Sequence, residues 1–494
     1  MTADKNTSSR LKDWRLFREQ AYINGEWHEA TSGDRFDVID PATGATLGSC
    51  PECATNDVIA AIDAAHASQA SFRMINPTQR AALLRRWAHE VRENRADLAT
   101  LITLENGKIY KEAIGEVLYA ANFLDWFAEE AVRNQGDFIQ TSDSSHRTVT
   151  VREPVGVCGL ITPWNFPAAM ITRKVGPAIA AGCTSVIKAP AETPFTALAL
   201  AELADRAGVP RGVINVITAN ENTAEIGNIL TTHKHIRKIS FTGSTRVGIL
   251  LAEKASATLK RLSLELGGLA PFIVFEDANV EEAVEGAVIS KFRAAGQTCV
   301  CANALFVHQS VYEQFVTLFA AKVRQLKIGN GFDENANIGP LIHDRAVSKV
   351  QAHVADAKKK GGVIVVGGEL ESDIGPRFFQ PTVIKFASTD MLCMSEETFG
   401  PVAGVIPFEL ESDVIQMANN CDVGLAGYFY SRDVNRCWRV AQSLEVGMVG
   451  INTGILSNPA SPFGGVKHSG YGREGSSYGM AEYTIVKSMT FGGN

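Results

Sequence analysis

Two cysteines stand one residue apart in the stretch GQTCVC, at Cys299 and Cys301. A pair this close can be half of a metal site, a reversible disulfide, a nucleophile beside a bystander, or two small core residues. A metal site needs further ligands, and neither a C-x-x-C nor an H-x-x-H pair lies nearby. The pair therefore favours thiol chemistry, and we expect no metal site.

A nucleophilic cysteine needs a position where the chain can present it. Cys299 follows a helix-like run that ends near Phe292 and precedes the β-like ALFVH, so we expect it on a loop. A structural cysteine would stand inside a strand or a helix instead. Nucleophilic chemistry also requires a base and a group that holds the developing oxyanion.

Two other residues suit those roles. Glu265 ends the apolar run LSLEL and precedes two glycines that allow close backbone approach, so a solvated position is improbable. Burial would raise its pKa toward neutrality, as a general base requires. Asn165 in ITPWNFP follows a β-like run and lies between two prolines, so its amide is held stiffly and can donate to an oxyanion.

Two glycine-rich stretches invite a dinucleotide interpretation. SGYGREG contains G-x-G-x-x-G, but too few residues follow it for a βαβ unit, so we reject it as a dinucleotide fingerprint. FTGSTRVG lies between a β-like run and a helix-like run. Gly243, Ser244 and Gly248 would there form an anion cradle at a helix N-terminus, with an ordinary strand-to-helix turn as the alternative.

Composition narrows the class of protein. A chain of 494 residues with 45% hydrophobic residues is long enough for two or three domains. The net charge of -7 offers no basic surface for nucleic acid or for an anionic membrane. Nine cysteines are too sparse for a disulfide-stapled secreted domain, and no apolar run is long enough to span a bilayer. We expect a cytoplasmic protein; the arginines near the N-terminus leave the mitochondrial matrix as the alternative.

From Pro154 onward, short β-rich runs alternate with helical stretches. This alternation predicts an α/β fold with a Rossmann-like, doubly wound cofactor domain. After residue 268 the alternation begins again and predicts a second α/β domain, whereas the segment before residue 130 reads as mostly helical. We expect a cofactor-binding domain at 1–132 and 152–267, and a catalytic domain at 268–470.

Two runs alternate like exposed strands, RTVTVREPVG and EYTIVKSMTF. Exposed strand edges commonly pair with another subunit. We therefore expect residues 133–151 and 471–494 to form a small β oligomerisation element, in a homodimer or a homotetramer.

Together these segments resemble the aldehyde dehydrogenase superfamily over nearly the whole chain. The segments that carry the resemblance are PWNFP, LELGG, GQTC, EETFGP and PFGGVKHSG, in family order and at family spacing. The resemblance implies that Cys299 attacks an aldehyde, that Asn165 holds the oxyanion, and that Glu265 activates water to hydrolyse the thioester. It also implies a set of cofactor-binding residues: Trp164, Lys188, Ala191, Gly243, Ser244, Gly248, Glu397 and Phe399.

Within that family, the chain is most similar to members that oxidise succinate semialdehyde. In those members two arginines and a serine grip the distal carboxylate, and the matching residues here are Arg173, Arg293 and Ser457. Guanidinium groups bind a planar carboxylate bidentately, and a neutral aldehyde would leave them unpaired. The alternatives are another carboxylate semialdehyde, such as glutarate or 2-oxoglutarate semialdehyde, and a catalytically silent binding or structural protein.

Two further questions are which nicotinamide cofactor is used and what the Cys301 thiol does. Family members that prefer NAD often carry a glutamate three residues after the cofactor lysine, but here that position is Ala191, so NADP is favoured over NAD. The resemblance also suggests that Cys301 forms a reversible disulfide with Cys299. Residues two apart in a strand sit near the limit for disulfide closure, which would need a local turn.

Overall fold

Five parallel strands form the centre of the first sheet, as the alternation of strands and helices predicted. Their order is β9-β8-β7-β10-β11, with β1 and β2 antiparallel at one edge and β21 antiparallel at the other. The chain reverses its direction of travel between β7 and β10, which is where doubly wound sheets bind ligands. The strands are β1 Ala21–Ile23, β2 Glu26–His28, β7 Val157–Ile161, β8 Ser185–Lys188, β9 Ile214–Ile217, β10 Ile236–Thr242, β11 Arg261–Glu265 and β21 Gly470–Tyr471.

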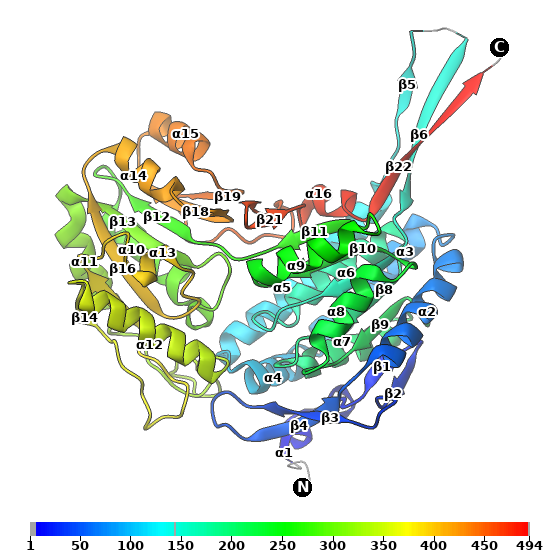
Figure 1. Ribbon diagram of the computed structural model, residues 1–494, viewed down its shortest axis with the longest axis horizontal. Helices are drawn as coiled ribbons and strands as arrows, with labels where there is room; N and C mark the ends of the chain where they lie inside the picture. The colour runs from blue at the N-terminus through cyan, green and yellow to red at the C-terminus, as the bar shows by residue number, and fades with distance from the viewer. Residues whose placement is uncertain (1–5, 143–144, 493–494) are drawn as a thin grey trace.

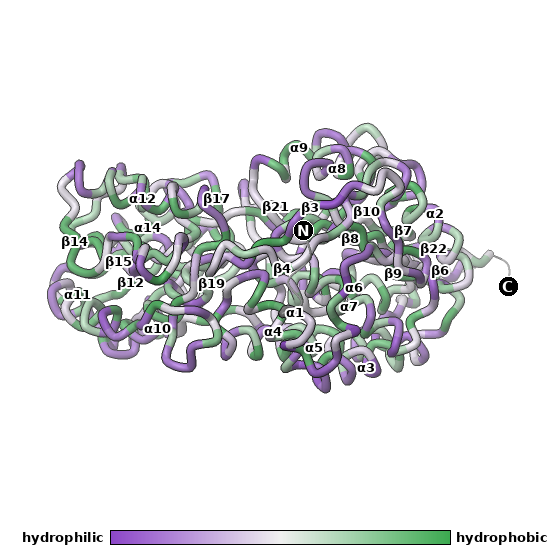
Figure 2. The backbone as a smooth tube through the Cα atoms, turned by 90° about the horizontal axis from the view of Figure 1, so that it is seen from below, coloured by the Kyte–Doolittle hydropathy of each residue, from purple (hydrophilic) through white to green (hydrophobic). Residues whose placement is uncertain are grey.

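Helices cover both faces of this sheet, with α2, α8 and α9 on one side and α3 to α7 on the other (Figure 2). Apolar side chains fill the space between each helical layer and the strands, so the sheet is buried on both faces. The helices are α2 Thr55–Phe72, α3 Pro77–Glu93, α4 Arg95–Asn106, α5 Tyr110–Val132, α6 Ala169–Ala181, α7 Pro194–Arg206, α8 Thr223–Thr232 and α9 Thr245–Ser256.

The N-terminal segment is less helical than expected. The structure, a computed structural model, describes residues 6–142 and 145–492, and places four short strands in the first 51 residues of the chain. Besides β1 and β2, these are the hairpin β3 Arg35–Ile39 and β4 Thr46–Pro51, preceded by the short helix α1 Asn6–Ser9. Strands of three to six residues are too short to show a clear alternating pattern.

The second lobe is a seven-stranded sheet in the order β14-β15-β16-β13-β12-β18-β19, which confirms the second α/β domain (Figure 1). All of its strands are parallel except β14 at the edge. The strands are β12 Ala270–Val274, β13 Ala302–His308, β14 Val363–Val366, β15 Thr382–Lys385, β16 Val402–Phe408, β18 Ala426–Tyr430 and β19 Met448–Ile451. The helices are α10 Val280–Phe292, α11 Gln309–Val323, α12 Asp344–Lys359, α13 Leu392–Ser395, α14 Glu411–Asn419 and α15 Val434–Ser443.

A three-stranded arm projects from the first lobe (Figure 1). It consists of β5 Phe138–Gln140, β6 His146–Pro154 and β22 Thr484–Gly492, in the order β22-β6-β5. The two runs predicted as exposed strands pair with each other, from Thr484 opposite Pro154 to Gly492 opposite His146.

The predicted boundary of the arm at residue 471 is wrong. β21 ends at Tyr471 and pairs with β11 in the first sheet, and α16 (Ser476–Ala481) packs against α5 and α6. Apolar contacts of Met480 and Tyr483 with the first lobe hold this segment away from the arm. Within the described residues, no helix has the length and apolar character needed to cross a membrane.

Candidate active site

The carboxyl ends of four neighbouring strands bring the predicted site residues to one edge of the first sheet. Lys188 ends β8 and Glu265 ends β11, and the strand pairs Ile161–Lys188 and Thr242–Glu265 show that all four ends are level. Asn165 lies just beyond the end of β7. Residues more than 20 positions apart in sequence therefore meet at the switch point of the sheet.

Cys299 lies on a strained loop between α10 and β13, as predicted. Ala294, Ala295 and Gly296 all adopt left-handed backbone conformations, with φ of 50°, 55° and 75°. A Cβ atom at Gly296 would lie 2.3 Å from the carbonyl oxygen of Gly400, so only glycine fits there. Left-handed alanines are costly and persist where the surrounding structure requires them, often at functional sites.

The thiol of Cys299 is protonated at neutral pH in the free protein. Burial raises its pKa to about 12; the Arg173 guanidinium opposes this rise and the Glu265 carboxyl adds to it. A cysteine attacks as the thiolate, but here the effect of burial on the pKa outweighs that of the nearby guanidinium. Attack on a carbonyl therefore needs a group that removes the proton.

Glu265 is buried, with 3% of its surface exposed, and neither carboxyl oxygen has a hydrogen-bond partner among the described residues. Burial, reinforced by the negative charge of Glu474, raises its pKa well above the ordinary value. The two glycines after Glu265 let the backbone approach the Cys299 loop closely, as expected. A Cβ atom on Gly268 would lie only 2.9 Å from the Cys299 carbonyl oxygen. The loop after Glu265 thus lies against the Cys299 loop.

Asn165 is fixed by contacts on both sides. Its side-chain Nδ2 donates to the carbonyl oxygen of Gln297 at 3.0 Å, which ties it to the loop that carries Cys299. The backbone carbonyl oxygen of Asn165 accepts a hydrogen bond from Nζ of Lys108 at 2.8 Å, and Lys108 forms a buried ion pair with Glu116. An amide nitrogen carries two hydrogens, so one hydrogen of Asn165 stays available for an oxyanion.

The residues predicted to hold a dinucleotide fit that ligand. Lys188 is 5% exposed, and its side-chain ammonium makes no hydrogen bond or ion pair with a described residue. Burial lowers the pKa of this lysine to about 8, while Glu192 and Glu52 favour its charge. A buried, unpartnered ammonium at the end of a parallel strand suits the hydroxyl or phosphate oxygens of a nucleotide.

The second lobe contributes the other side of this region. The Trp164 ring meets the Phe399 ring edge-on at 5.6 Å, and Phe399 has a left-handed backbone with φ of 52°. Glu397 accepts a hydrogen bond from the Gly268 N–H at 3.1 Å, and burial raises its pKa to about 7. Both lobes therefore meet at the candidate nicotinamide site.

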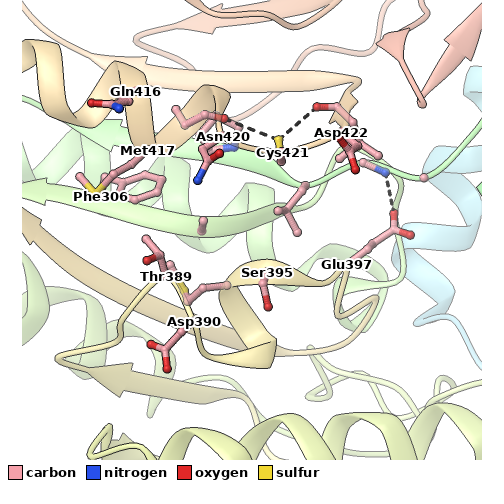
Figure 3. Close-up of a pocket in the computed structure, with 18 of the residues that line it drawn as sticks. Phe306, Thr389, Asp390, Ser395, Glu397, Gln416, Met417, Asn420, Cys421 and Asp422 are labelled. Carbon is pink, nitrogen blue, oxygen red and sulfur yellow. Dashed lines mark hydrogen bonds between the residues drawn. The ribbon is translucent and has the colours of Figure 1, made fainter.

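A cavity of about 640 Å³ opens beside Glu397, lined by Thr245, Gly267 and Gly268 on the first-lobe side. In Figure 3, Asn420, Cys421 and Asp422 lie above the opening, and Thr389, Asp390 and Ser395 lie below it. Of the predicted cofactor residues, Glu397 alone lines this cavity. Phe399 lies on the second lobe, and the other predicted cofactor residues lie along the edge of the first sheet.

The glycine-rich turn partly matches its predicted role as an anion cradle. The Gly243 N–H donates to the Glu265 carbonyl oxygen at 3.0 Å, so it is not free for an anion. Ser244 caps α9 by accepting from the Val247 N–H at 3.4 Å. A Cβ atom on Gly248 would lie 2.4 Å from the Leu266 side chain, which makes this glycine a packing requirement. The first N–H groups of α9 remain for a phosphate.

A second cavity, of about 310 Å³, holds two of the three predicted carboxylate-binding residues. Arg293 and Ser457 line it together with Tyr119 and Phe166, and the Arg293 guanidinium lies 5.3 Å from the centre of the Phe166 ring. Lys108, the other cation in the lining, is paired with Glu116. Arg293 forms no ion pair with a described residue, although the Glu112 carboxyl also lines the cavity and Arg293 opposes the rise that burial causes in the Glu112 pKa.

Arg173 differs from its prediction. It does not line the cavity but lies behind it, paired with Glu474 and stacked on Phe463 at 4.2 Å. Arg173 lies beside Tyr119. Burial raises the pKa of Tyr119, and the Arg173 guanidinium opposes that rise. Tyr119 and Glu474 escaped sequence reasoning, although Glu474 belongs to the glycine-rich stretch examined above.

Cys301 is buried, and both it and Cys299 are free cysteines. The Cys301 N–H bonds to the Thr298 carbonyl oxygen at 3.1 Å, which forms the local turn that a disulfide would need. Its thiol donates to the Lys291 carbonyl oxygen at 3.4 Å. The disulfide between the two cysteines stays a prediction.

Comparisons with known proteins agree with this geometry. The family model described as "Aldehyde dehydrogenase family" matches residues 27–489. The chain is 53% identical to "Succinate-semialdehyde dehydrogenase [NADP(+)] 1" of Schizosaccharomyces pombe, over 99% of both chains. It is 51% identical to a "Glutarate-semialdehyde dehydrogenase" of Pseudomonas putida, over 97% of this chain and 99% of that one.

A solved structure is equally similar. The crystal structure of succinate-semialdehyde dehydrogenase from Burkholderia pseudomallei is 52% identical, with a TM-score of 0.96 over 98% of this chain and 99% of that chain. The resemblance seen in the motifs is therefore confirmed at the level of sequence and of fold. The chain belongs to the aldehyde dehydrogenase family and is an NAD(P)-dependent oxidoreductase.

Proposed function

We propose that the protein oxidises succinate semialdehyde to succinate with reduction of NADP⁺, through a covalent adduct on Cys299. The observation that carries the proposal is the 310 Å³ cavity in which the unpaired Arg293 and Ser457 line the approach to the Cys299 loop. A guanidinium that lines a cavity without an ion-pair partner can bind the carboxylate at the far end of an aldehyde substrate. The names of the similar relatives support this substrate class.

In the first half of the reaction, the Cys299 sulfur bonds to the aldehyde carbon, and the carbonyl π electrons move to the oxygen. The Asn165 amide and the Cys299 N–H donate to that oxygen. Because the thiol pKa is about 12, its proton must leave to solvent as attack begins, and the Arg173 guanidinium favours the thiolate that remains. A bound oxidised nicotinamide would supply the acceptor for a hydride from the substrate carbon, and loss of that hydride would leave a thioester on Cys299.

In the second half, Glu265 takes a proton from water, and the resulting hydroxide attacks the thioester carbon. The carbon–sulfur bond breaks, succinate leaves, and the Cys299 thiolate regains a proton. Glu265 must be ionised for this step, although its burial favours the neutral acid. The activity should therefore rise with pH.

Lys188 and Glu397 would hold the ribose hydroxyls of the cofactor, and Ala191 leaves room for a 2′-phosphate. No carboxylate stands at position 191 to repel that phosphate, and Glu192 is one position further along the chain. A relative at 53% identity carries NADP(+) in its name, which also favours NADP over NAD. The alternative substrate is glutarate semialdehyde, since a relative at 51% identity carries that name.

We also propose that the protein assembles as a homodimer or homotetramer through the arm. β22 and β5 form the two edges of the arm sheet, and apolar side chains on them are exposed, among them Phe138 at 63% and Val486 at 62%. Exposed apolar strand edges call for a partner strand. We propose that the protein is cytoplasmic, because the first 20 residues contain acidic residues and transit peptides are poor in them.

A steady-state matrix tests the substrate and the cofactor together. Succinate semialdehyde, glutarate semialdehyde and butanal are each assayed with NADP⁺ and with NAD⁺, followed at the nicotinamide absorbance. We expect the highest kcat/KM for succinate semialdehyde with NADP⁺, and the lowest for butanal, which lacks a carboxylate. Equal kcat/KM for butanal and succinate semialdehyde would rule out carboxylate recognition, and absence of any turnover would favour a silent scaffold.

A further inference from the structure

A cluster of imidazoles and a carboxylate lies on the first lobe, at the edge of the sheet opposite the active site. His233 and His235 occupy the turn between α8 and β10, and Asp63 lies on α2. One ligand atom from each of these three side chains lies within 4.8 Å of the other two. They belong to neither of the cavities described above and to no step of the proposed reaction.

The fold brings these side chains together from two elements. α2 and α8 pack against each other on the same face of the sheet (Figure 2). Nδ1 of His235 lies 3.6 Å from Oδ1 of Asp63, and the His233 and His235 rings meet edge-on at 5.2 Å. The backbone N–H of His235 donates to Nδ1 of His233 at 3.3 Å, which fixes the turn.

Two further observations indicate that His235 is held as a ligand would be. Its Nδ1 is buried and has no hydrogen-bond partner among the described residues. His66, one turn along α2 from Asp63, stacks on the His235 ring at 3.7 Å with an interplanar angle of 16°. The nitrogen faces the Asp63 carboxylate at 3.6 Å, and a ring locked by stacking and aimed at a carboxylate is prepared for a cation.

We propose that Asp63, His233 and His235 bind one divalent transition-metal ion, with zinc as the ion that the ligand set fits. Two imidazoles and one carboxylate suit zinc and neighbouring borderline metals more than magnesium or calcium, which prefer oxygen ligands. In tetrahedral geometry, ligand atoms about 2.1 Å from zinc lie about 3.4 Å apart, so the side chains would close from within 4.8 Å by side-chain rotation.

Charges around the cluster are compatible with a cation. Lys234 and Lys260 lie near His233, but Nζ of Lys260 is held by the His233 carbonyl oxygen at 2.8 Å and Lys234 is exposed. The side chain of Asp63 is 60% exposed, which gives the ion a path of entry and leaves a coordination position for water.

The role of such an ion would be structural. It would cross-link α2 to the turn before β10, at the amino ends of the strands, far from the carboxyl ends that carry Lys188 and Glu265. This site differs from the expectation of no metal site, which rested on the absence of further ligands near Cys299 and Cys301. Asp63, the carboxylate of the cluster, lies 170 positions before His233. A hydrogen bond between Thr55 and Glu225 joins α2 to α8 over the same separation in sequence.

The test measures zinc bound per chain by the chelator-treated enzyme in equilibrium dialysis. The parent should bind one more zinc ion per chain than His233→Gln/His235→Gln, and Asp63→Asn should bind that ion at least about tenfold more weakly. His28→Gln/His89→Gln, which alters two exposed histidines outside the cluster, should bind as the parent does. Dehydrogenase activity, expected to be unchanged in every variant, reports that each one is folded.

Cobalt substitution separates this site from the cysteines. Cobalt(II) bound by imidazole and carboxylate gives weak visible bands without the near-ultraviolet charge-transfer band of a thiolate ligand. We expect the equivalent lost in the double variant to be the one without that band. Equal zinc binding by parent and double variant, or a thiolate band on the lost equivalent, would overturn the proposal. If the double variant fails to fold, the exposed Asp63→Asn change decides alone.

Discussion

Arg173 and Glu474 form an ion pair whose side chains are only 3% and 5% exposed, directly behind the candidate substrate cavity. Lys174 also pairs with Glu474, so a single carboxylate balances two buried cations. Burial alone would raise the pKa of Glu474, but the two cations hold it below its ordinary value. The same negative charge raises the pKa of Glu265, so this pair sets the electrostatics of the proposed base.

Replacement of Glu474 by glutamine should destabilise the protein and shift its activity profile. The change leaves Arg173 and Lys174 buried without a counter-charge, which costs about 3–5 kcal/mol of the free energy of unfolding. Loss of the Glu474 charge also lowers the pKa of Glu265, so the rise in activity with pH should begin at lower pH. Chemical denaturation and a kcat–pH profile measure the two effects.

A surface pair provides the control for Glu474→Gln. Glu153 pairs with Lys487 on the arm, where the Lys487 side chain is 50% exposed and the Glu153 side chain 25%, and Arg73 lies 3.7 Å from the same carboxylate. Exposed pairs contribute about 0–1 kcal/mol, so Glu153→Gln should change neither stability nor the pH profile appreciably. An unchanged pH profile in Glu474→Gln would contradict electrostatic coupling between Glu474 and Glu265.

Cys299→Ser should lower kcat for succinate semialdehyde by at least about a thousandfold, because a serine hydroxyl is a weaker nucleophile than a cysteine thiol in this buried position. NADP⁺ should still bind, because the proposed cofactor residues are unaffected, and fluorescence titration checks this. Cys301→Ser is the matched control and should keep most of the activity. Turnover by Cys299→Ser at the parent rate would exclude the covalent route.

Glu265→Gln keeps the size of the side chain and removes the base. Acylation should still deliver one hydride per site, while hydrolysis should slow by about 10²–10⁴-fold. Rapid mixing should therefore show a burst of reduced cofactor equal to the number of sites, followed by slow turnover. Steady turnover at the parent rate without a burst is the opposite outcome and would assign the base elsewhere.

Arg293→Leu tests carboxylate recognition. Loss of a charge-assisted contact costs about 2–3 kcal/mol, so kcat/KM for succinate semialdehyde should fall about 30- to 150-fold. The kcat/KM for butanal should stay the same or rise, because the cavity becomes more apolar. Arg345→Leu, on an exposed position of α12, should leave both substrates unchanged. An equal loss for both aldehydes would indicate a structural role for Arg293.

Ala191→Glu tests the basis of cofactor choice. A carboxylate at this position would repel the 2′-phosphate of NADP⁺ and accept a hydrogen bond from the ribose hydroxyl of NAD⁺. We expect kcat/KM for NADP⁺ to fall at least about tenfold, a change of about 1.4 kcal/mol, while that for NAD⁺ is kept or improves. Initial rates with both cofactors measure the ratio. A parallel loss for both cofactors would contradict charge-based selection.

The central strands of both sheets were predictable because each is short, apolar and followed by an amphipathic helix. Strands buried on both faces read as continuous apolar runs, and β7, β8 and β9 are buried along their whole length. The hairpins near the N-terminus lack such runs and escaped prediction. The pairing of β6 with β22 was also invisible, since the sequence indicated only that both are exposed strands.

The proposed chemistry followed from three residues that stand in distinctive local contexts. Cys299, Glu265 and Asn165 each precede or follow a turn at the end of a strand or helix, where spacing is informative. Glu474 and Tyr119 have no such local signal. Their positions beside Arg173 arise from packing between α5, α6 and the segment after β21, which only the folded chain reveals.

The first lobe is a discontinuous unit, and this determines when it can finish folding during translation. Lys174 and Glu474 are 300 residues apart, so at about 5–20 residues per second the cation waits about 15–60 seconds for its counter-charge. β11 and β6 likewise await β21 and β22 while the ribosome completes the second lobe. The nascent first lobe therefore emerges with open strand edges and an unneutralised interior, a substrate for chaperones until the last segment is released.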